Sequence, residues 1–367
     1  MKKIEKALFA CGGTGGHIFP AIALADELKR RVPGVKIAFV GAENGMENDL
    51  VPRAGYELFP LPISGLYRTL NLKNLRRNAF LPFKFVLSFW MSYRLIRRFE
   101  PNLVVGTGGY ASFPLLRAAV YRPKVFRAIQ EQNAFPGLSN RLLAPFVDAV
   151  FLGNEAAKKY FPENKCRYTG NPVRVFPPKN RDELLSKWQI ESGKTVLFAT
   201  GGSLGAGALN AAIHNHLDAI LNQNVHLIWQ TGKLYFEKYR LLVGNKRHLN
   251  LAPFVDDVSE AYTLAEAVVS RAGALTLSEL MHYRKPALLI PSPNVAEDHQ
   301  RHNAESLTRI GGARMLLESE LNDKFLPALT HLLEHRISIV ERLESLPVKD
   351  AAKECIDAII ELYGRKD

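Results

Sequence analysis

The segment Ala10–Pro20, with the sequence ACGGTGGHIFP, constrains this chain more than any other stretch. Four glycines and a threonine fill positions 12–16, and His17 follows at once. The apolar run Ala7–Ala10 predicts a buried first strand, and the apolar spacing within Ala21–Leu28 predicts a helix. A glycine loop between a strand and a helix N-terminus favours a bound phosphate, because backbone N–H groups can approach it. His17 adds a side chain that exchanges protons near neutral pH.

This loop does not match the two best-known phosphate-binding patterns. No lysine follows the glycines, so it is not a Walker A motif. Gly13 and Gly15 fit the G-x-G-x-x-G spacing of dinucleotide folds, but Ile18 stands at the third glycine position. A tight turn without a ligand is the alternative interpretation, and the adjacent histidine favours a functional one.

Composition limits the classes of protein that this chain can be. A length of 367 residues predicts two domains, and 47% hydrophobic with 23% charged residues is typical of a soluble globular protein. The three cysteines are far apart and odd in number, which indicates a reducing compartment without a disulfide framework. The sequence contains no cluster of Cys and His residues that would predict a metal site. The apolar run near the N-terminus is too short for an export signal.

The net charge of +12 is concentrated in the first third of the chain. Residues 1–130 contain 20 Lys or Arg and 8 Asp or Glu, whereas the remaining residues contain 28 of each kind. Within Arg53–Arg127 there are 13 basic residues and only two acids, Glu57 and Glu100. Such a surface attracts nucleic acid, an anionic membrane or an anionic substrate.

Short apolar runs alternate with helical patterns, as in parallel sheets covered on both faces. Beyond the first strand, the expected strands are Lys36–Gly41, Leu103–Gly106, Lys124–Ala128, Ala149–Leu152, Thr195–Thr200, His226–Gln230, Ala267–Ser270 and Ala287–Ile290. A polar, proline-rich break near residues 168–180 divides the pattern, and Lys194–Gly207 then repeats the order of strand, glycine loop and helix. We therefore predict an α/β protein of two Rossmann-like domains, residues 1–170 and 171–347, with ligands beyond the carboxyl ends of the strands. The amphipathic segment 348–367 either caps the second domain or returns to the first.

Three glycine loops follow predicted strands: Gly12–His17, Gly106–Ser112 and Gly201–Gly207. Together they predict a site for several phosphates. Ser203 in the third loop can donate a hydrogen bond to a phosphate oxygen, and the alternative role of a helix N-cap is compatible with that contact. The polar residues Glu131–Asn133 follow another strand and are expected to face the same site.

Two segments of the second half are candidates for binding a nucleotide sugar. In Ser270–Pro286, Glu279 can accept hydrogen bonds from ribose hydroxyls, although an acid early in a helix also simply complements the dipole. In Pro291–Ala304, the polar side chains of Asp298, His299, Gln300 and Asn303 can bind sugar hydroxyls, with a solvated helix start as the alternative.

The segment Leu72–Phe99 mixes aromatic and basic residues and is too charged to span a bilayer. It suits a helix pair resting on an anionic membrane surface, and a buried helix with a solvated basic face is the alternative. The residues expected to contact the membrane are Arg76, Arg77, Phe80, Phe83, Lys84 and Trp90.

Taken in order and spacing, the motifs resemble one family closely. They are GGTGGHIFPAIALADEL, ISGL, VVGTGGYASFP, EQNAFPGLSNRLL, TGNPVR, GGSLGA, SRAGALTLSE and EDHQRHNA, and they extend from about Lys6 to about Ala304. This pattern is similar to that of the peptidoglycan N-acetylglucosaminyltransferases, which act on undecaprenyl-diphospho-muramoyl-pentapeptide. The resemblance implies the GT-B fold, with two Rossmann-like domains facing across a cleft and a terminal helix returning to the first.

The resemblance also implies roles for individual residues. His17 corresponds to the proposed general base. The donor contacts correspond to Thr14, Gly15, Gly16, Asn133, Arg174, Ser203, the backbone of Val255, Ala274, Leu275, Thr276, Leu277, Ser278, Glu279 and Gln300. The acceptor diphosphate is assigned to Gly13, Thr14, Gly108, Gly109 and Tyr110. His299 and Arg301, which flank Gln300, are variable positions in the family.

The implied reaction transfers N-acetylglucosamine from UDP-N-acetylglucosamine to the 4-hydroxyl of the lipid-linked muramoyl sugar, with inversion, and requires no metal or other cofactor. The implied setting is peripheral, on the cytoplasmic face of the bacterial inner membrane, with room for contacts to other cell-wall synthesis proteins and no role for nucleic acid. Two alternatives are a UDP-N-acetylglucosamine 2-epimerase, which needs no membrane surface, and a nucleic-acid binder, which would leave the glycine loops and Glu279 unexplained.

Overall fold

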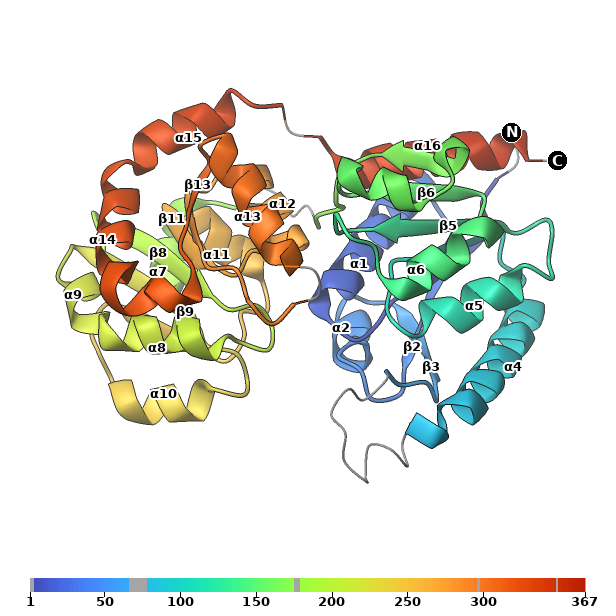
Figure 1. The fold of residues 1–367 in the computed structure, drawn as a ribbon, viewed down its shortest axis with the longest axis horizontal. Helices are drawn as coiled ribbons and strands as arrows, with labels where there is room; N and C mark the ends of the chain where they lie inside the picture. The colour runs from blue at the N-terminus through green and yellow to red at the C-terminus, as the bar shows by residue number, and fades with distance from the viewer. Residues whose placement is uncertain (1–2, 66–77, 175–178, 296–297, 348, 367) are drawn as a thin grey trace. The chain divides into compact units, whose positions relative to one another are not determined.

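The computed structural model describes residues 3–65, 78–174, 179–295, 298–347 and 349–366. It divides into two compact units, one formed by Met1–Arg174 with Lys349–Asp367 and the other by Val175–Val348 (Figure 1). Each unit is an α/β layer structure around its own sheet. Among the described residues, no helix has both the length and the apolar composition that crossing a bilayer requires.

The sheet of the first unit has seven parallel strands in the order β3-β2-β1-β4-β5-β6-β7. The strands are β1 (Lys6–Ala10), β2 (Lys36–Ala42), β3 (Glu57–Leu61), β4 (Leu103–Gly106), β5 (Phe126–Glu131), β6 (Ala149–Leu152) and β7 (Cys166–Tyr168). The helices are α1 (Gly15–Arg31), α2 (Glu47–Arg53), α4 (Leu81–Phe99), α5 (Ser112–Ala119), α6 (Leu138–Leu143) and α16 (Ala351–Arg365), with 3₁₀ turns at Ala144–Phe146, Glu155–Tyr160 and Glu163–Lys165.

Alternate residues of the strands pack on opposite faces of this sheet. Ala7 and Phe9 belong to the core that α1, α2 and α16 cover, whereas Leu8 and Ala10 belong to the core beneath α4, α5 and α6. The last helix of the chain, α16, buries Cys355, Ile356, Ile359 and Tyr363 in the first of these cores and packs against α1 (Figure 1).

The second unit repeats this plan with six parallel strands in the order β10-β9-β8-β11-β12-β13. They are β8 (Thr195–Thr200), β9 (Val225–Gln230), β10 (Leu249–Ala252), β11 (Ala267–Ser270), β12 (Ala287–Leu289) and β13 (Ala313–Met315). The helices are α7 (Arg181–Lys187), α8 (Gly207–Asn215), α9 (Leu217–Leu221), α10 (Phe236–Val243), α11 (Val258–Leu264), α12 (Ala274–His282), α13 (His299–Arg309), α14 (Leu321–Glu334) and α15 (Arg336–Glu344), with a 3₁₀ turn at Glu318–Glu320. The α/β class and the parallel sheets are confirmed.

Every predicted strand matches or overlaps a strand of a sheet, although the predicted Lys124–Ala128 starts two residues before β5 and ends three residues short of its end; β3, β7, β10 and β13 were missed. All four are edge strands. Tyr168 in β7 and Glu57 in β3 are exposed, and all four residues of β10 are partly exposed. A strand covered on fewer sides needs no continuous apolar run, so the pattern that detects interior strands does not detect these.

Candidate functional site

The first glycine loop connects β1 to α1 as predicted. Thr14 is the N-cap of α1 in an extended conformation, and Gly13 has a φ of 87°, a value that favours glycine. The first turn of α1 contains no acidic residue. The N–H groups of Gly15 and Gly16 begin the helix, where they have no acceptor within it, so this end of α1 can receive an anion.

A buried carboxylate, which the sequence analysis did not single out, lies beneath this loop. Glu47 has no exposed surface, and its carboxylate accepts hydrogen bonds from the N–H of Gly13 (3.1 Å) and of Ala42 (2.8 Å). A Cβ added to Gly12, Gly41 or Gly45 would lie within 2.5 Å of the Glu47 side chain. These glycines therefore make room for a carboxylate, and the Gly13 N–H points to Glu47, which leaves the predicted diphosphate contact to Thr14 and the second loop.

The second glycine loop packs directly on the first. Gly108 has a φ of 108°, and a Cβ there would lie 2.6 Å from Nδ1 of His17. A Cβ on Gly109 would lie 2.4 Å from the carbonyl oxygen of Gly12. The Ser112 hydroxyl donates hydrogen bonds to the carbonyls of Ala10 (2.9 Å) and Gly108 (2.7 Å). The structure therefore brings His17, Gly108 and Gly109 together.

The ring of His17 is held through one of its two nitrogens. Nδ1 lies 3.0 Å from the carbonyl oxygen of Thr107 and 3.0 Å from Oε1 of Gln132. The Thr107 hydroxyl in turn donates to the carbonyl oxygen of His17 (2.6 Å). Because both neighbours of Nδ1 are hydrogen-bond acceptors, we assign the single N–H proton of the neutral imidazole to Nδ1. Nε2 then carries the lone pair that a general base needs.

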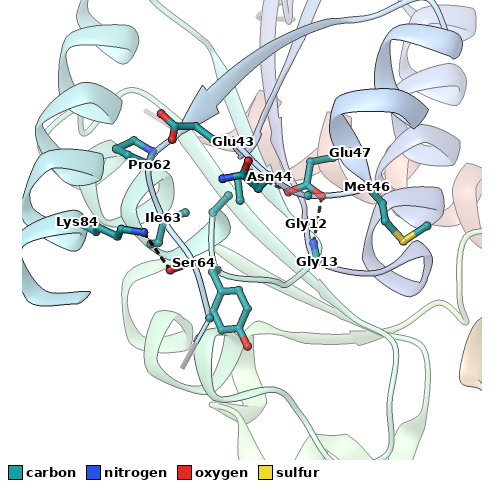
Figure 2. Close-up of a pocket in the computed structure, with 15 residues that line it drawn as sticks. Gly12, Gly13, Glu43, Asn44, Met46, Glu47, Pro62, Ile63, Ser64 and Lys84 are labelled. Atoms are coloured by element: carbon teal, nitrogen blue, oxygen red, sulfur yellow. Dashed lines mark hydrogen bonds between the residues drawn. The ribbon is translucent and has the colours of Figure 1, made fainter. Parts of the chain in front are cut away.

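A pocket of about 370 Å³ opens beside these loops, at the carboxyl ends of β1, β2 and β3 (Figure 2). Its polar lining includes Glu43, Asn44, Ser64 and Lys84, and the Lys84 ammonium donates to the Ser64 hydroxyl (3.4 Å; Figure 2). The aromatic residue Tyr110, predicted to contact the acceptor diphosphate, also lines it. Lys84, predicted to contact a membrane, thus faces a pocket of the first unit.

Three further residues of the predicted membrane face belong to α4 or directly precede it: Phe80 is its N-cap, and Phe83 and Trp90 lie in its first half. Phe80, Phe83 and Trp90 are 62%, 67% and 51% exposed, and Val86 is 64% exposed. The opposite side of α4 buries Ser88, Ser92 and Ile96. Arg76 and Arg77 lie outside the described residues. The aromatic side chains are therefore at the surface, which agrees poorly with the alternative of a buried helix.

The polar segment after β5 is organised by Glu131. This buried carboxylate accepts hydrogen bonds from the backbone N–H of Asn133 (3.0 Å) and Gly137 (3.1 Å), and from the side-chain amides of Asn133 (3.2 Å) and Asn140 (2.9 Å). The sequence analysis expected Glu131 to face a ligand. The structure instead turns it into its own loop, where it fixes Asn133.

Arg174 also has a protein partner. Its Nε donates to the carboxylate of Asp26 in α1 (2.8 Å), which accepts a second hydrogen bond from the Tyr56 hydroxyl (2.6 Å). The predicted contact of Arg174 with the donor therefore starts from a guanidinium already anchored in the first unit.

The third glycine loop lies in the second unit, between β8 and α8. The N-cap of α8 is Ala206, so the alternative that Ser203 caps this helix is wrong. Gln230, at the end of β9, donates to the Thr200 hydroxyl (2.9 Å) and the Gly202 carbonyl (3.1 Å), while its Oε1 accepts from the Val255 N–H (2.9 Å). The sequence analysis did not name Gln230 as a site residue. Because its Oε1 occupies the N–H of Val255, only the carbonyl of Val255 remains for a backbone contact with a ligand.

Glu279, the predicted ribose ligand, lies in α12. Five further predicted donor contacts lie in the same helix: Ala274, Leu275, Thr276, Leu277 and Ser278. The Glu279 carboxylate accepts a hydrogen bond from the Tyr262 hydroxyl (3.0 Å). Burial raises the pKa of Glu279 to about 7, although the Tyr262 hydrogen bond opposes that shift. Gln300 is the second residue of the next helix, α13, and its Oε1 accepts from the N–H of Ser292 (2.9 Å).

Comparison with known proteins decides the family. A model described as the glycosyltransferase family 28 N-terminal domain matches residues 7–152, and one described as the family 28 C-terminal domain matches residues 196–355. The chain belongs to glycosyltransferase family 28. The predicted family, the GT-B fold class and the assignment as a hexosyltransferase are confirmed.

Named family 28 relatives match this chain over nearly its whole length. The UDP-N-acetylglucosamine--N-acetylmuramyl-(pentapeptide) pyrophosphoryl-undecaprenol N-acetylglucosamine transferase of Flavobacterium psychrophilum is 40% identical over 97% of this chain and 97% of that protein. The protein of the same name from Christiangramia forsetii is 41% identical over 100% of both chains.

Solved structures agree with this fold. The crystal structure of Acinetobacter baumannii MurG is 26% identical, covers 97% of this chain and 99% of that one, and has a TM-score of 0.68. A putative UDP-N-acetylglucosamine 2-epimerase from Listeria monocytogenes has a TM-score of 0.69 over 100% of this chain and 98% of that one. Its identity is only 14%, so it shows the fold alone.

Proposed function

We propose that this protein transfers N-acetylglucosamine from UDP-N-acetylglucosamine to N-acetylmuramyl-(pentapeptide) pyrophosphoryl-undecaprenol, the reaction named for its relatives. The observation that carries this function is 40% identity over 97% of the chain to a transferase of that name. The reaction serves peptidoglycan biosynthesis, because its product is a lipid-linked disaccharide built on a muramoyl-peptide.

For the chemical step we propose His17 as the general base. Its Nδ1 faces two oxygen acceptors, which supports a free lone pair on Nε2. Nε2 takes the proton of the acceptor 4-hydroxyl while that oxygen attacks the anomeric carbon of the donor. The bond from this carbon to the UDP oxygen breaks, its electrons leave with UDP, and the configuration inverts to give a β1→4 linkage.

We further propose that the departing UDP is stabilised by backbone N–H groups and the Ser203 hydroxyl of the third glycine loop. Glu279 would accept hydrogen bonds from the ribose, and Gln300 would contact the sugar hydroxyls. Asn133 and Arg174 of the first unit are proposed as further donor contacts. This arrangement needs no metal, and full activity in the presence of EDTA is the expected test.

We propose that the enzyme binds the membrane peripherally, at the cytoplasmic face, through aromatic side chains of the first half of α4 and of its N-cap, Phe80. Exposed Phe80, Phe83 and Trp90 support this surface, together with the positive charge of the first third of the chain. We also propose contacts with other cell-wall synthesis proteins at the membrane, because the acceptor remains in the bilayer.

The direct test measures transfer of labelled sugar from UDP-N-acetylglucosamine to a short-chain acceptor analogue. Formation of labelled disaccharide with stoichiometric UDP supports the proposal. Conversion of the nucleotide sugar to its 2-epimer without acceptor would support an epimerase instead, and a salt-dependent gel shift without sugar transfer would support nucleic-acid binding.

A further inference from the structure

A series of hydrogen-bonded, buried side-chain amides extends from Asn171, near the end of the segment Met1–Arg174, to His17. Gln130, Gln132 and Asn171 are 0%, 3% and 8% exposed. Gln130 and Gln132 lie at and just beyond the end of β5, and Asn171 follows β7. Buried amides must satisfy both their oxygen and their nitrogen, so their contacts reveal which way each is turned.

The orientation of Gln132 follows from its neighbours. Its Nε2 lies near three oxygens: the carbonyl of Thr107 (2.8 Å), the carbonyl of Gln130 (3.2 Å) and Oε1 of Gln130 (2.5 Å). Turning the amide over would place its oxygen against those three acceptors. The nitrogen therefore faces them, and Oε1 faces Nδ1 of His17.

Asn171 holds this arrangement from behind. Its Oδ1 accepts a hydrogen bond from Nε2 of Gln130 (3.1 Å), and its Nδ2 donates to the carbonyl of Gln132 (3.2 Å). Gly153 leaves room for this amide, because a Cβ there would lie 1.7 Å from Oδ1 of Asn171. Each amide in the series thus fixes the next, from Asn171 to Gln130 and from Gln130 to Gln132.

We propose that Gln132 is a positioning residue, which keeps the proton of neutral His17 on Nδ1 and so keeps Nε2 as the proton acceptor. Two oxygens, from Thr107 and Gln132, can accept from Nδ1, and neither can donate to it. The wrong tautomer would place a lone pair against two oxygens and leave Nε2 protonated. This inference rests on the proposed role of His17 as base.

Uncharged groups surround the Nδ1 edge of the ring. They are the Thr107 carbonyl, the Gln132 amide and the backbone of Gly108. The nearby carboxylates of Glu131 and Glu47 are directed to their own loop amides. A carboxylate introduced at position 132 would therefore be a new charge beside the ring, and it would favour the imidazolium.

The test compares Gln132→Glu and Gln132→Met with the wild type. We expect Gln132→Glu to stabilise the His17 imidazolium and so move the acid limb of the kcat profile to higher pH, because the base stays protonated longer. Gln132→Met removes one of the two acceptors. Loss of one orienting hydrogen bond predicts a kcat about three- to tenfold lower, with little change in the KM values.

A spectroscopic measurement separates positioning from a general loss of structure. Nitrogen-15 NMR of histidine-labelled protein, with the His17 signals assigned from a His17→Ala sample, reports the tautomer directly. We expect the wild type to show Nδ1–H and Gln132→Met to lose part of that preference. Gln223→Met is the matched control, because Gln223 of the second unit also makes two hydrogen bonds, to Ala219 and Thr330, away from the site.

The outcomes distinguish this inference from the proposed base role. An unchanged His17 tautomer in Gln132→Met, together with an unchanged balance of imidazole and imidazolium in Gln132→Glu, would overturn the inference. If Gln132→Glu shifts the NMR titration of His17 while the kcat profile stays in place, positioning of the ring stands and the base role fails. If Gln223→Met lowers kcat as much as Gln132→Met, the effect is a general consequence of losing an amide.

Discussion

With Glu279 as the proposed ribose ligand, its raised pKa predicts a donor affinity that depends on pH near neutrality. Burial raises this pKa from the ordinary 4.5 to about 7. A ribose hydroxyl donates to a carboxylate better than to a carboxylic acid, so donor binding needs the ionised form. With a pKa of about 7, roughly one tenth of Glu279 is ionised at pH 6 and nine tenths at pH 8. We therefore expect the Kd for UDP-N-acetylglucosamine to fall about tenfold between these pH values.

Isothermal titration calorimetry with UDP-N-acetylglucosamine measures this dependence. The nucleotide sugar is preferable to UDP, because the terminal phosphate of UDP titrates near pH 6 itself, at about the usual value for a phosphate monoester. Glu279→Gln should bind weakly at both pH values, without the change of about tenfold. Glu237→Gln, which removes an exposed carboxylate on α10, is the control and should bind as the wild type does.

The same shift has a consequence for folding. Because the folded pKa lies above the unfolded one, Glu279 contributes stability that is complete below about pH 4.5 and is lost as pH rises through 7. A shift of this size corresponds to at most about 3 kcal/mol, and partial exposure of the residue reduces it. Glu279→Gln should thus unfold at higher urea than the wild type at pH 8. A Kd that is constant from pH 6 to 8, with no gain in stability for Glu279→Gln, would refute this account of the carboxylate.

Three further predictions concern the first unit. His17→Ala should lower kcat by about 10²–10⁴-fold with UDP binding intact, and near-normal turnover with a raised acceptor KM would contradict the base role. Glu47→Gln should destabilise the protein by about 1–3 kcal/mol in urea unfolding, because the new amide nitrogen would face a backbone N–H. The control is Glu43→Gln, since Glu43 is a nearby exposed carboxylate. The pair Phe83→Asp and Trp90→Asp should abolish pelleting with anionic vesicles and spare transfer to a water-soluble acceptor; pelleting as strong as that of the wild type would exclude this surface.

Sequence patterns predicted the interior of each sheet and the glycine loops, because both depend on local features. Strands covered on both faces are continuous apolar runs, and a loop that packs closely against another needs glycine. Gly108 and Gly109 were predicted as part of a phosphate-binding loop, and the structure shows that they also pack against His17 and Gly12.

Residues that act on the backbone of distant segments could not be predicted in this way. Glu47 comes 34 positions after Gly13, and Gln230 binds Val255 from another strand, so no local pattern connects them. Edge strands such as β7 were missed because partial exposure removes the apolar signal. A cluster of glycines around an acid, as at Gly41, Gly45 and Glu47, is a usable signal for a buried carboxylate.

The position of α16 sets an order of events during synthesis. The N-terminal unit leaves its α1 face uncovered until the last helix emerges, since Cys355, Ile356 and Ile359 complete that core. At about 5–20 residues per second, the ribosome needs roughly 9–35 s to make the intervening segment 175–348. That segment is continuous and can fold first, so the part of the protein that is made first is the part that is finished last. A nascent chain would present this uncovered apolar surface to chaperones and proteases for that whole interval. A chain stalled before α16 would never cover it.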